Sequence, residues 1–223
     1  MRWWWLGAGM SIALLVGNAA SAAVTQGQQD DFDGVTDAWA QGTPALGGPD
    51  GASDGFLMLH ADGVSQNGKI VTYNQLQWAG NYTAAGVEAI GMFVRNLGDT
   101  DLSLRVALGT TSAPSAGGTW FASTDPVSLP AGGDWQLVVF PLGSDDLTRT
   151  QGTASYATVL GGVVTLRILH SAVPSAFGDN IVATLGVDRV LALPEPGATS
   201  LAASGVVALA ICARLRARRQ RAG

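Results

Sequence analysis

The chain has 223 residues, of which 47% are hydrophobic, 13% are charged and 30 are glycine. Between Val24 and Leu193, six lysine and arginine residues stand against sixteen aspartate and glutamate residues, so this stretch has a formal charge of −10. Such an acidic stretch excludes nucleic acid as a partner, because phosphate contacts need a basic face. The only cysteine, Cys212, lies outside the stretch, which excludes a disulfide framework and a catalytic thiol within it.

The N-terminal segment has the layout of a secretory signal peptide. Arg2 provides a positive start, residues 3–17 form an apolar stretch, and Ala20 and Ala22 flank a serine in a small-x-small cleavage site. A retained transmembrane anchor is the alternative, and the alanine-rich end of the segment disfavours it. We therefore expect residues 1–22 to be removed after export.

Residues 23–193 show strand periodicity interrupted by turn-forming residues. In "DLSLRVALGT", Leu102, Leu104 and Val106 alternate with Ser103 and Arg105. Further runs are FLMLHAD, KIVTYNQLQWAG, VEAIGMFVRN, WQLVVFPLG, VVTLRILHS and IVATLGVDRVLAL, with short strands at 30–33 and 119–123. About nine strands joined by Gly-, Asp- and Ser-rich loops, with no useful helical period, predict an all-β jelly roll of two antiparallel sheets. A signal helix and a C-terminal transmembrane helix are expected to flank this sandwich.

Catalytic side chains are sparse in this body. His60 and His170 each alternate with apolar neighbours on predicted strands, and Glu88 is the only glutamate before the tail. No His-Glu-x-x-His motif occurs. A retaining glycosidase needs two carboxyl groups about 5–5.5 Å apart, and no pattern marks such a pair. We expect a non-enzymatic protein. The alternatives are a polysaccharide-degrading or modifying enzyme on the same fold and a purely structural matrix protein.

Four aromatic residues are candidates for sugar binding, because sugars stack on exposed rings. Trp78, Tyr82 and Trp120, together with Tyr73, fall in or near strand edges and loops. The first three are the predicted ligand-binding residues. Packing in the core is the alternative for each ring, and it is the expected role of Trp39 and Trp135.

The body also carries a family pattern. It opens with "DDFDGVTDAWAQ", continues with the glycine-rich "GGPDGASDG" before a strand, and closes with "TLGVDRVLAL". This order resembles the β-sandwich domains of carbohydrate-binding modules and of laminin-G-like or galactose-binding-like folds. The resemblance implies a structural calcium ion, with ligands at Asp31, Asp33, Asp54 and Asp188. The alternative is that these aspartates are solvated or form ordinary Asp-Gly turns.

The C-terminal segment, residues 194–223, combines three features in order. Pro194, Glu195 and Pro196 are followed by the uncharged residues 197–213, which are at the short limit for a membrane-spanning helix. Five arginines then follow within eight residues, a cluster that would hold this end in the cytoplasm.

This arrangement resembles the PEP-CTERM sorting signal of Gram-negative bacteria. The resemblance implies processing by an exosortase after transient anchoring in the inner membrane, and then release to the cell surface or extracellular matrix. The expected function is therefore that of an exported, exosortase-sorted protein that associates with extracellular polysaccharide.

Overall fold

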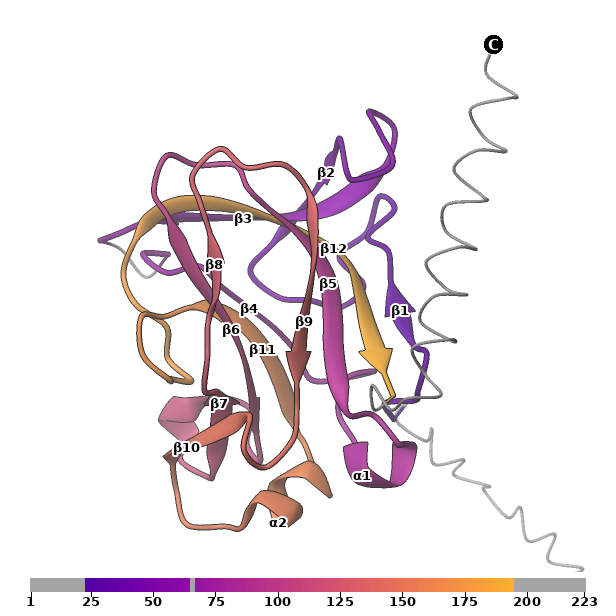
Figure 1. Cartoon of the computed structure of the whole chain (residues 1–223), viewed down its shortest axis with the longest axis vertical. Helices are drawn as coiled ribbons and strands as arrows, with labels where there is room; N and C mark the ends of the chain where they lie inside the picture. The colour runs from indigo at the N-terminus through magenta and orange to yellow at the C-terminus, as the bar shows by residue number, and fades with distance from the viewer. Residues whose placement is uncertain (1–22, 65–66, 195–223) are drawn as a thin grey trace, which may run out of the picture.

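The computed structural model describes residues 23–64 and 67–194 (Figure 1). Within these ranges, no helix has the length and apolar character needed to cross a membrane. The predicted signal peptide with Ala20 and Ala22, the sorting residues Glu195 and Pro196, and the apolar stretch 197–213 lie outside the described residues.

The described chain folds into two antiparallel sheets that pack face to face (Figure 1). Sheet A has the order β2-β3-β12-β5-β9, and β1 also pairs with β12. Its strands are β1 (Gln29–Asp30), β2 (Thr43–Leu46), β3 (Gly55–Asp62), β5 (Ala89–Asn96), β9 (Gln136–Pro141) and β12 (Val182–Leu193).

Sheet B has the order β10-β7-β6-β11-β4, and β8 also pairs with β6. Its strands are β4 (Val71–Asn74), β6 (Leu102–Gly109), β7 (Trp120–Ser123), β8 (Val127–Leu129), β10 (Leu147–Gln151) and β11 (Thr165–His170). The predicted all-β sandwich of two antiparallel sheets is confirmed.

Three helices of at most five residues interrupt the described strands: α1 (Tyr82–Ala85), η1 (Pro114–Ala116) and α2 (Tyr156–Leu160). Side chains cap the two α-helical turns, Asn81 at α1 and Ser155 at α2, which periodicity does not reveal. At α1, the Asn81 side chain accepts a hydrogen bond from the Ala84 amide, and Gly86 ends the turn at φ 66°. The expectation of a body without useful helical periodicity therefore omitted these single turns.

The main core lies between the sheets, and β6 shows how the sequence pattern builds it. Leu102, Leu104 and Val106 point inward and are at most 2% exposed, as their alternation predicts. Arg105, on the opposite face, is also buried, at 2% exposure. A second, smaller cluster covers this outer face of sheet B, and its members are Val71, Ala107, Trp120, Ala122, Leu169 and Ala176. Sheet B is thus buried on both faces over part of its area.

The first and last strands lie side by side. Asp30 on β1 is opposite Val190 on β12, and the two strands are antiparallel. The register of β12 against β5 shifts between Asp188 and Leu191, and within this bulge Arg189 has a φ of 49°. The first strand is shorter than predicted because the backbone turns at Phe32, where φ is 55°.

Candidate calcium corner and carbohydrate-binding face

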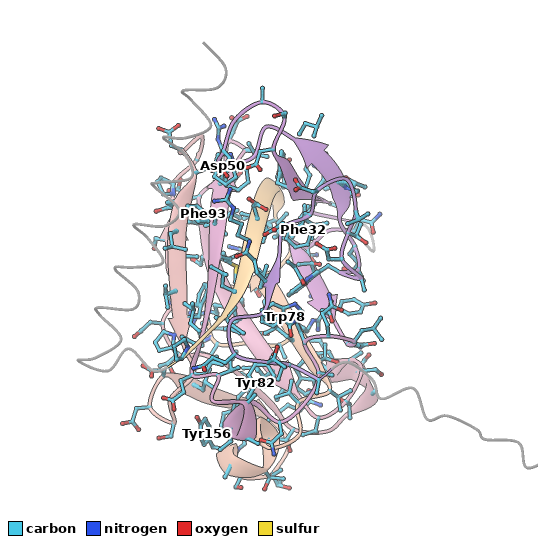
Figure 2. The ribbon with its side chains drawn as sticks, turned by 90° about the vertical axis from the view of Figure 1, so that its right-hand side faces the viewer. Phe32, Asp50, Trp78, Tyr82, Phe93 and Tyr156 are labelled. Carbon is cyan, nitrogen blue, oxygen red and sulfur yellow. The ribbon has the colours of Figure 1, made fainter. Side chains whose placement is uncertain are left out.

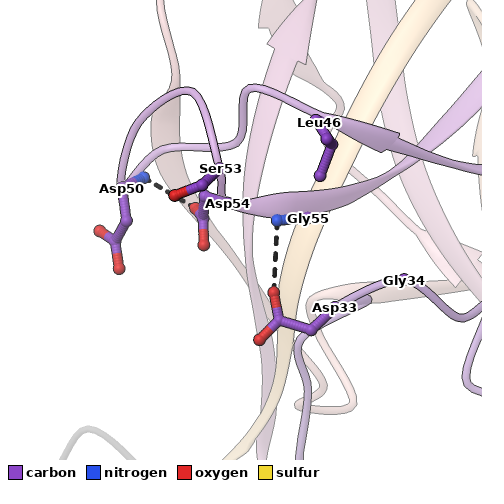
Figure 3. Close-up of a pocket in the computed structure, with 7 residues that line it drawn as sticks. All are labelled: Asp33, Gly34, Leu46, Asp50, Ser53, Asp54 and Gly55. Atoms are coloured by element: carbon purple, nitrogen blue, oxygen red, sulfur yellow. Dashed lines mark hydrogen bonds between the residues drawn. The ribbon is translucent and has the colours of Figure 1, made fainter.

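An acidic corner forms where the turn after β1, the loop between β2 and β3 and the bulge of β12 meet. We use this name for Asp31, Asp33, Asp50, Asp54 and Asp188 together with Arg189. A polar pocket of about 430 Å³ opens at the corner (Figure 3). Its lining residues are Asp33, Gly34, Leu46, Asp50, Ser53, Asp54 and Gly55. The corner therefore offers several carboxylate oxygens to a bound cation.

Close backbone approach holds the two loops of the acidic corner together. Asp33 Oδ1 accepts a hydrogen bond from the Gly55 amide at 3.3 Å, and Asp54 Oδ2 accepts one from the Asp50 amide at 2.8 Å (Figure 3). A Cβ atom at Gly55 would stand 2.5 Å from the Phe32 carbonyl oxygen, so only glycine fits there. The glycine-rich loop thus serves packing as well as turning.

Asp188 is the exceptional residue of this corner, because it is buried without a hydrogen-bond donor. The residue is 1% exposed, and neither carboxylate oxygen has a hydrogen bond of normal geometry among the described residues. Burial raises the pKa of Asp188 to about 8, and the charges of Asp54 and Asp31 add to this rise. Arg189 opposes it through its charge and through its nearby backbone amide. Most buried carboxylates accept hydrogen bonds, so the two unsatisfied oxygens of Asp188 are an exception.

Arg189 already places a positive charge in the acidic corner. Its guanidinium pairs with Asp50, lies 3.7 Å from Asp54 Oδ2, and has its Nε 3.6 Å from Asp188 Oδ2. The Phe93 ring lies beneath it, with the guanidinium carbon 5.3 Å from the ring centroid. Sequence analysis did not predict a role for Arg189, because no sequence motif indicates a bulge that turns an arginine toward a neighbouring loop.

The four predicted calcium ligands lie in the same region but do not converge on one point. The described residues contain no group of three or more His, Cys, Asp or Glu side chains placed to hold a metal ion. Asp31 is exposed, and its carboxylate accepts a hydrogen bond from Gln29. Among the four, Asp188 is the one whose buried oxygens lack a hydrogen-bond donor, and Asp54 and Asp31 are its charged neighbours.

The structure buries all three predicted ligand-binding aromatics. Trp78, Tyr82 and Trp120 each have 0% exposure. Trp78 donates from Nε1 to Asp30 Oδ2 at 2.6 Å, and the Tyr82 hydroxyl donates to the Trp78 carbonyl at 2.9 Å. Figure 2 shows these two rings inside the body, at a distance from Asp50 and Phe93. In this packing the rings present no free face to a sugar.

Trp120 is covered on the outside of sheet B. Its ring lies so close to Gly109 that a Cβ atom there would stand 2.3 Å from the ring atoms. Its Nε1 donates to the Gly117 carbonyl at 3.1 Å. Trp39 is buried as expected, at 2% exposure. Trp135 is outside the core: it is partly exposed on sheet A, where it packs edge-on against Phe56.

The outer face of sheet B carries a partly exposed aromatic and polar cluster. We call Tyr73, Gln75, Thr165 and Arg167 the sheet B face. Tyr73 and Arg167 are directly opposite each other on β4 and β11, and the guanidinium lies 5.9 Å from the tyrosine ring centroid. Gln75 donates to Thr165 Oγ1 at 3.1 Å. Tyr73, Gln75 and Arg167 all retain partial exposure, so solvent or a ligand can reach them.

Residues 171–181 form a loop over part of the same sheet, and cations hold it in place. Arg105 donates to the carbonyls of Ser171 and Ala172 at 2.9 and 3.0 Å. Arg167 donates to the Ala176 carbonyl at 2.6 Å, and Lys69 donates to the Gly178 carbonyl at 2.8 Å. The loop therefore borders the sheet B face and limits it on one side.

Several solved structures are similar to this chain at low sequence identity. No protein-family model matches the chain, and no curated protein matches it. A family 11 carbohydrate-binding module from Clostridium thermocellum, solved with a β-1,3-1,4-mixed-linked tetrasaccharide, is similar at 14% identity and a TM-score of 0.49. The match covers 77% of this chain and 98% of the module. The likeness is one of fold.

An exo-β-agarase is also similar, with 14% identity and a TM-score of 0.50 over 75% of this chain. The agarase AgWH50C matches 77% of this chain at 9% identity, with a TM-score of 0.49. The matches cover 24% and 26% of these two enzymes, so this chain corresponds to about a quarter of each. These likenesses again concern the β-sandwich alone.

Proposed function

We propose that this protein is a non-enzymatic polysaccharide-binding protein, and that the sheet B face is its binding surface. The observation that carries the proposal is the cluster of a partly exposed Tyr73 ring with the polar side chains Gln75 and Arg167 on an otherwise regular sheet. A ring offers a face to the C–H surface of a sugar, and neighbouring amide and guanidinium groups bind hydroxyls. A flat sheet suits an extended chain better than a small molecule.

The distribution of carboxylates supports binding over hydrolysis. None of the six strands of sheet B contains an aspartate or glutamate. A glycosidase needs a pair of carboxyl groups on either side of the bound sugar. In the described chain the carboxylates that cluster are those of the acidic corner, where Asp50 and Asp54 are occupied by Arg189. An enzyme on this fold would have to use that corner in place of the sheet.

Retention on insoluble polysaccharides tests the binding proposal. Mixed-linked β-glucan and agarose are suitable first matrices, with the flow-through and bound fractions measured for each variant. We expect Tyr73→Ala to lower retention at least about tenfold, because stacking on one aromatic ring contributes on the order of 1–3 kcal/mol. Leu137→Ala, at a residue 54% exposed on sheet A, is the matched control. Equal retention of both variants would place binding elsewhere, and sugar release from the matrix would indicate an enzyme.

We propose a structural calcium ion as the cofactor of the acidic corner. Asp188 would hold it, with Asp54 and Asp31 as further oxygen donors. When bound, the ion would supply positive charge to carboxylates that are otherwise unsatisfied. This chain's own residues join the β2–β3 loop to the bulge of β12 through Arg189, which bridges Asp50 and Asp54. The ion would reinforce that connection and would have no part in catalysis.

We also propose that the protein is exported and sorted by an exosortase before it reaches the cell surface or the extracellular matrix. The support is in the sequence: a signal-peptide layout at one end and Pro194-Glu195-Pro196, an uncharged stretch and an arginine cluster at the other. A location among secreted polysaccharides agrees with the proposed binding function.

A further inference from the structure

The two sheets of the sandwich differ in charge. The body as a whole is strongly acidic, yet the charged residues within the strands of sheet B are Arg105, Arg149 and Arg167. The strands of sheet A include Asp30, Asp62 and Asp188 besides two arginines. The strands of sheet B therefore contribute no carboxylate that would repel a bound anion. The loop of residues 171–181 that borders the sheet contains one, Asp179, whose Oδ2 accepts hydrogen bonds from Ser171 and Ala172.

The surroundings of the three arginines identify which one can bind a ligand. Arg105 is 2% exposed and donates to the carbonyls of Ser123, Thr124, Ser171 and Ala172, so its donors are used inside the protein. Arg149 is exposed on the edge strand β10, opposite the core residue Phe121. Arg167 combines partial exposure with a central strand of the sheet.

Arg167 has donors to spare. Among the described residues, Arg167 forms one hydrogen bond, from Nη1 to the Ala176 carbonyl. A guanidinium carries five N–H groups. Arg167 forms no ion pair with a carboxylate of the described residues. The ion pairs among these residues are all formed by Arg189. Burial lowers the pKa of Arg167 to about 10, with the neighbouring Tyr73 opposing, so the side chain is still a cation at neutral pH. The Tyr73 and Trp120 rings, each 5.9 Å from the guanidinium, fix its position.

We propose that the sheet B face recognises an acidic polysaccharide, and that Arg167 binds the carboxylate or sulfate group of one sugar while Tyr73 contacts its ring. This inference rests on the proposed binding function and adds the chemical class of the ligand. A planar guanidinium can donate two parallel hydrogen bonds to a carboxylate or sulfate, and such charge-assisted bonds are stronger than those to a neutral hydroxyl. Gln75 donates its amide hydrogens to the Ser112 carbonyl and to Thr165 Oγ1, so its Oε1 is the atom that would accept from a neighbouring sugar hydroxyl.

The net charge of the protein makes the proposal testable. A body with a formal charge of −10 repels polyanions at long range, so non-specific adsorption of an acidic polysaccharide is disfavoured. Specific retention must therefore come from short-range contacts at a site. This separates the protein from basic proteins, which bind polyanions without a built site.

The experiment compares acidic polysaccharides with neutral forms of the same chain. The exported protein, purified as the full processed chain, is run in affinity gels that contain polygalacturonate or its methyl ester, and dextran sulfate or dextran. We expect retention by at least one acidic chain and at least about tenfold weaker retention by its neutral counterpart, because charge-assisted hydrogen bonds exceed neutral ones by that order. The two acidic probes distinguish carboxylate from sulfate recognition.

Variants assign the effect to one residue. Arg167→Gln removes the charge and is expected to lose at least about tenfold in retention, whereas Arg167→Lys keeps the charge without the planar fork and should lose less. Arg149→Gln removes the same charge from an exposed edge position and should remain within about twofold of the native protein. Thermal unfolding of each variant confirms that it is folded before its retention is compared.

The outcomes separate this inference from the proposed function. Equal retention by acidic and neutral chains would overturn the inference and leave polysaccharide binding intact. Retention by neither acidic chain would also overturn it, and the neutral matrices would then decide the function by themselves. An equal loss in Arg149→Gln and Arg167→Gln would show a general charge effect and would reject a site at Arg167.

Discussion

At the residue scale, residues 23–64 and 67–194 contain two buried carboxylates with opposite surroundings. Asp30 Oδ2 accepts hydrogen bonds from the indole nitrogens of Trp39 and Trp78, at 2.7 and 2.6 Å, and from the Gln77 amide at 3.1 Å. Asp188 has no such donor among the described residues. Burial raises the pKa of both, although the hydrogen bonds of Asp30 oppose the rise. One carboxylate therefore organises the core, and the other is left for an additional partner.

Replacing Asp30 tests its part in holding two tryptophans. Asp30→Ala leaves the Trp39 and Trp78 N–H groups without an acceptor in a buried place. Each unmet donor costs about 1–3 kcal/mol, so we expect the free energy of unfolding to fall by about 2–6 kcal/mol. Urea denaturation measures the change, and Asp145→Ala, at an exposed loop position, should alter it by less than about 0.5 kcal/mol. A fall as small as that of the control would contradict the role of Asp30.

The raised pKa of Asp188 predicts an unusual dependence of stability on pH. The folded protein holds the proton up to about pH 8, whereas the unfolded chain releases it near the ordinary pKa of 3.8. In chelator, the contribution of Asp188 to stability is thus fully present below pH 3.8 and is lost as pH rises toward about 8. The slope is at most about 1.4 kcal/mol per pH unit. Asp188→Asn should remove this slope and be more stable than the native protein at pH 8.

We expect calcium to reverse the order of stability of the native protein and Asp188→Asn. An ion needs the charged carboxylate, so at pH 8 calcium is expected to raise the melting temperature of the native protein and to leave that of Asp188→Asn nearly unchanged. Differential scanning calorimetry with calcium and with chelator provides the measurement. An equal response of both proteins to calcium would exclude Asp188 as a ligand.

At the element scale, the strands with a strong apolar pattern were predictable, including the edge strands β4 and β9, whereas β2, β8 and β10 were not. β5, β6, β11 and β12 are apolar on at least one face, and their runs stand out in the sequence. β2 contains Pro44 and is exposed along most of its length, as suits an edge strand, and β10 is a polar run. Edge strands need no strong apolar pattern, because half of their surroundings are solvent. Twelve strands therefore occur in the described chain where about nine were expected.

The candidate site divides in the same way. Sequence analysis predicted Asp188 and the aspartates after β1 as ligands of one site. The structure places them in one region because the first and last strands of the sandwich are neighbours. Sequence analysis could not place Arg189, whose direction depends on a bulge with a φ of 49°. Nor could it tell that Trp78 lies inside and Tyr73 partly outside, because both occur in one run and the change of burial follows from the end of β4 at Asn74.

We expect the loop of residues 171–181 to depend on the buried cation of Arg105. Arg105→Leu removes the hydrogen bonds to the Ser171 and Ala172 carbonyls and those to β7. We expect a loss of about 2–4 kcal/mol in stability and faster hydrogen exchange at the Asp179 amide, which now donates to the His170 carbonyl. Mass spectrometry of exchange in this loop measures the effect, with Arg149→Leu as control. Unchanged exchange would mean that the loop holds itself.

At the scale of the whole molecule, the acidic corner and the proposed binding surface belong to different sheets. Sheet A bears the acidic corner and the strand that leads to the C-terminal segment, whereas sheet B bears the proposed binding surface. A ligand on sheet B would thus lie on a different sheet from the acidic corner. The charge division between the sheets agrees with this separation.

The C-terminal sorting proposal has a direct test in cells that encode an exosortase. Replacing Pro194, Glu195 and Pro196 with alanine should block processing, so that the chain accumulates as a longer form in the inner-membrane fraction. Immunoblots of membrane, surface and medium fractions measure this, with the native chain expected outside the membrane in a shorter form. The same distribution for both chains would argue against recognition of the triplet.

The position of β12 has a mechanical consequence. If the C-terminal segment anchors the protein while flow pulls on the bound ligand, the force enters β12 at Leu193 and acts along this strand. That end lies between partners, with Leu193 opposite Ala89 on β5 and Leu191 opposite Gln29 on β1. Tension would have to break rows of hydrogen bonds on both sides at once, where an edge strand would peel from one neighbour. Force spectroscopy on a chain attached through Pro194 should therefore record a single high-force event, and the sandwich would act as a durable link between a surface and its matrix.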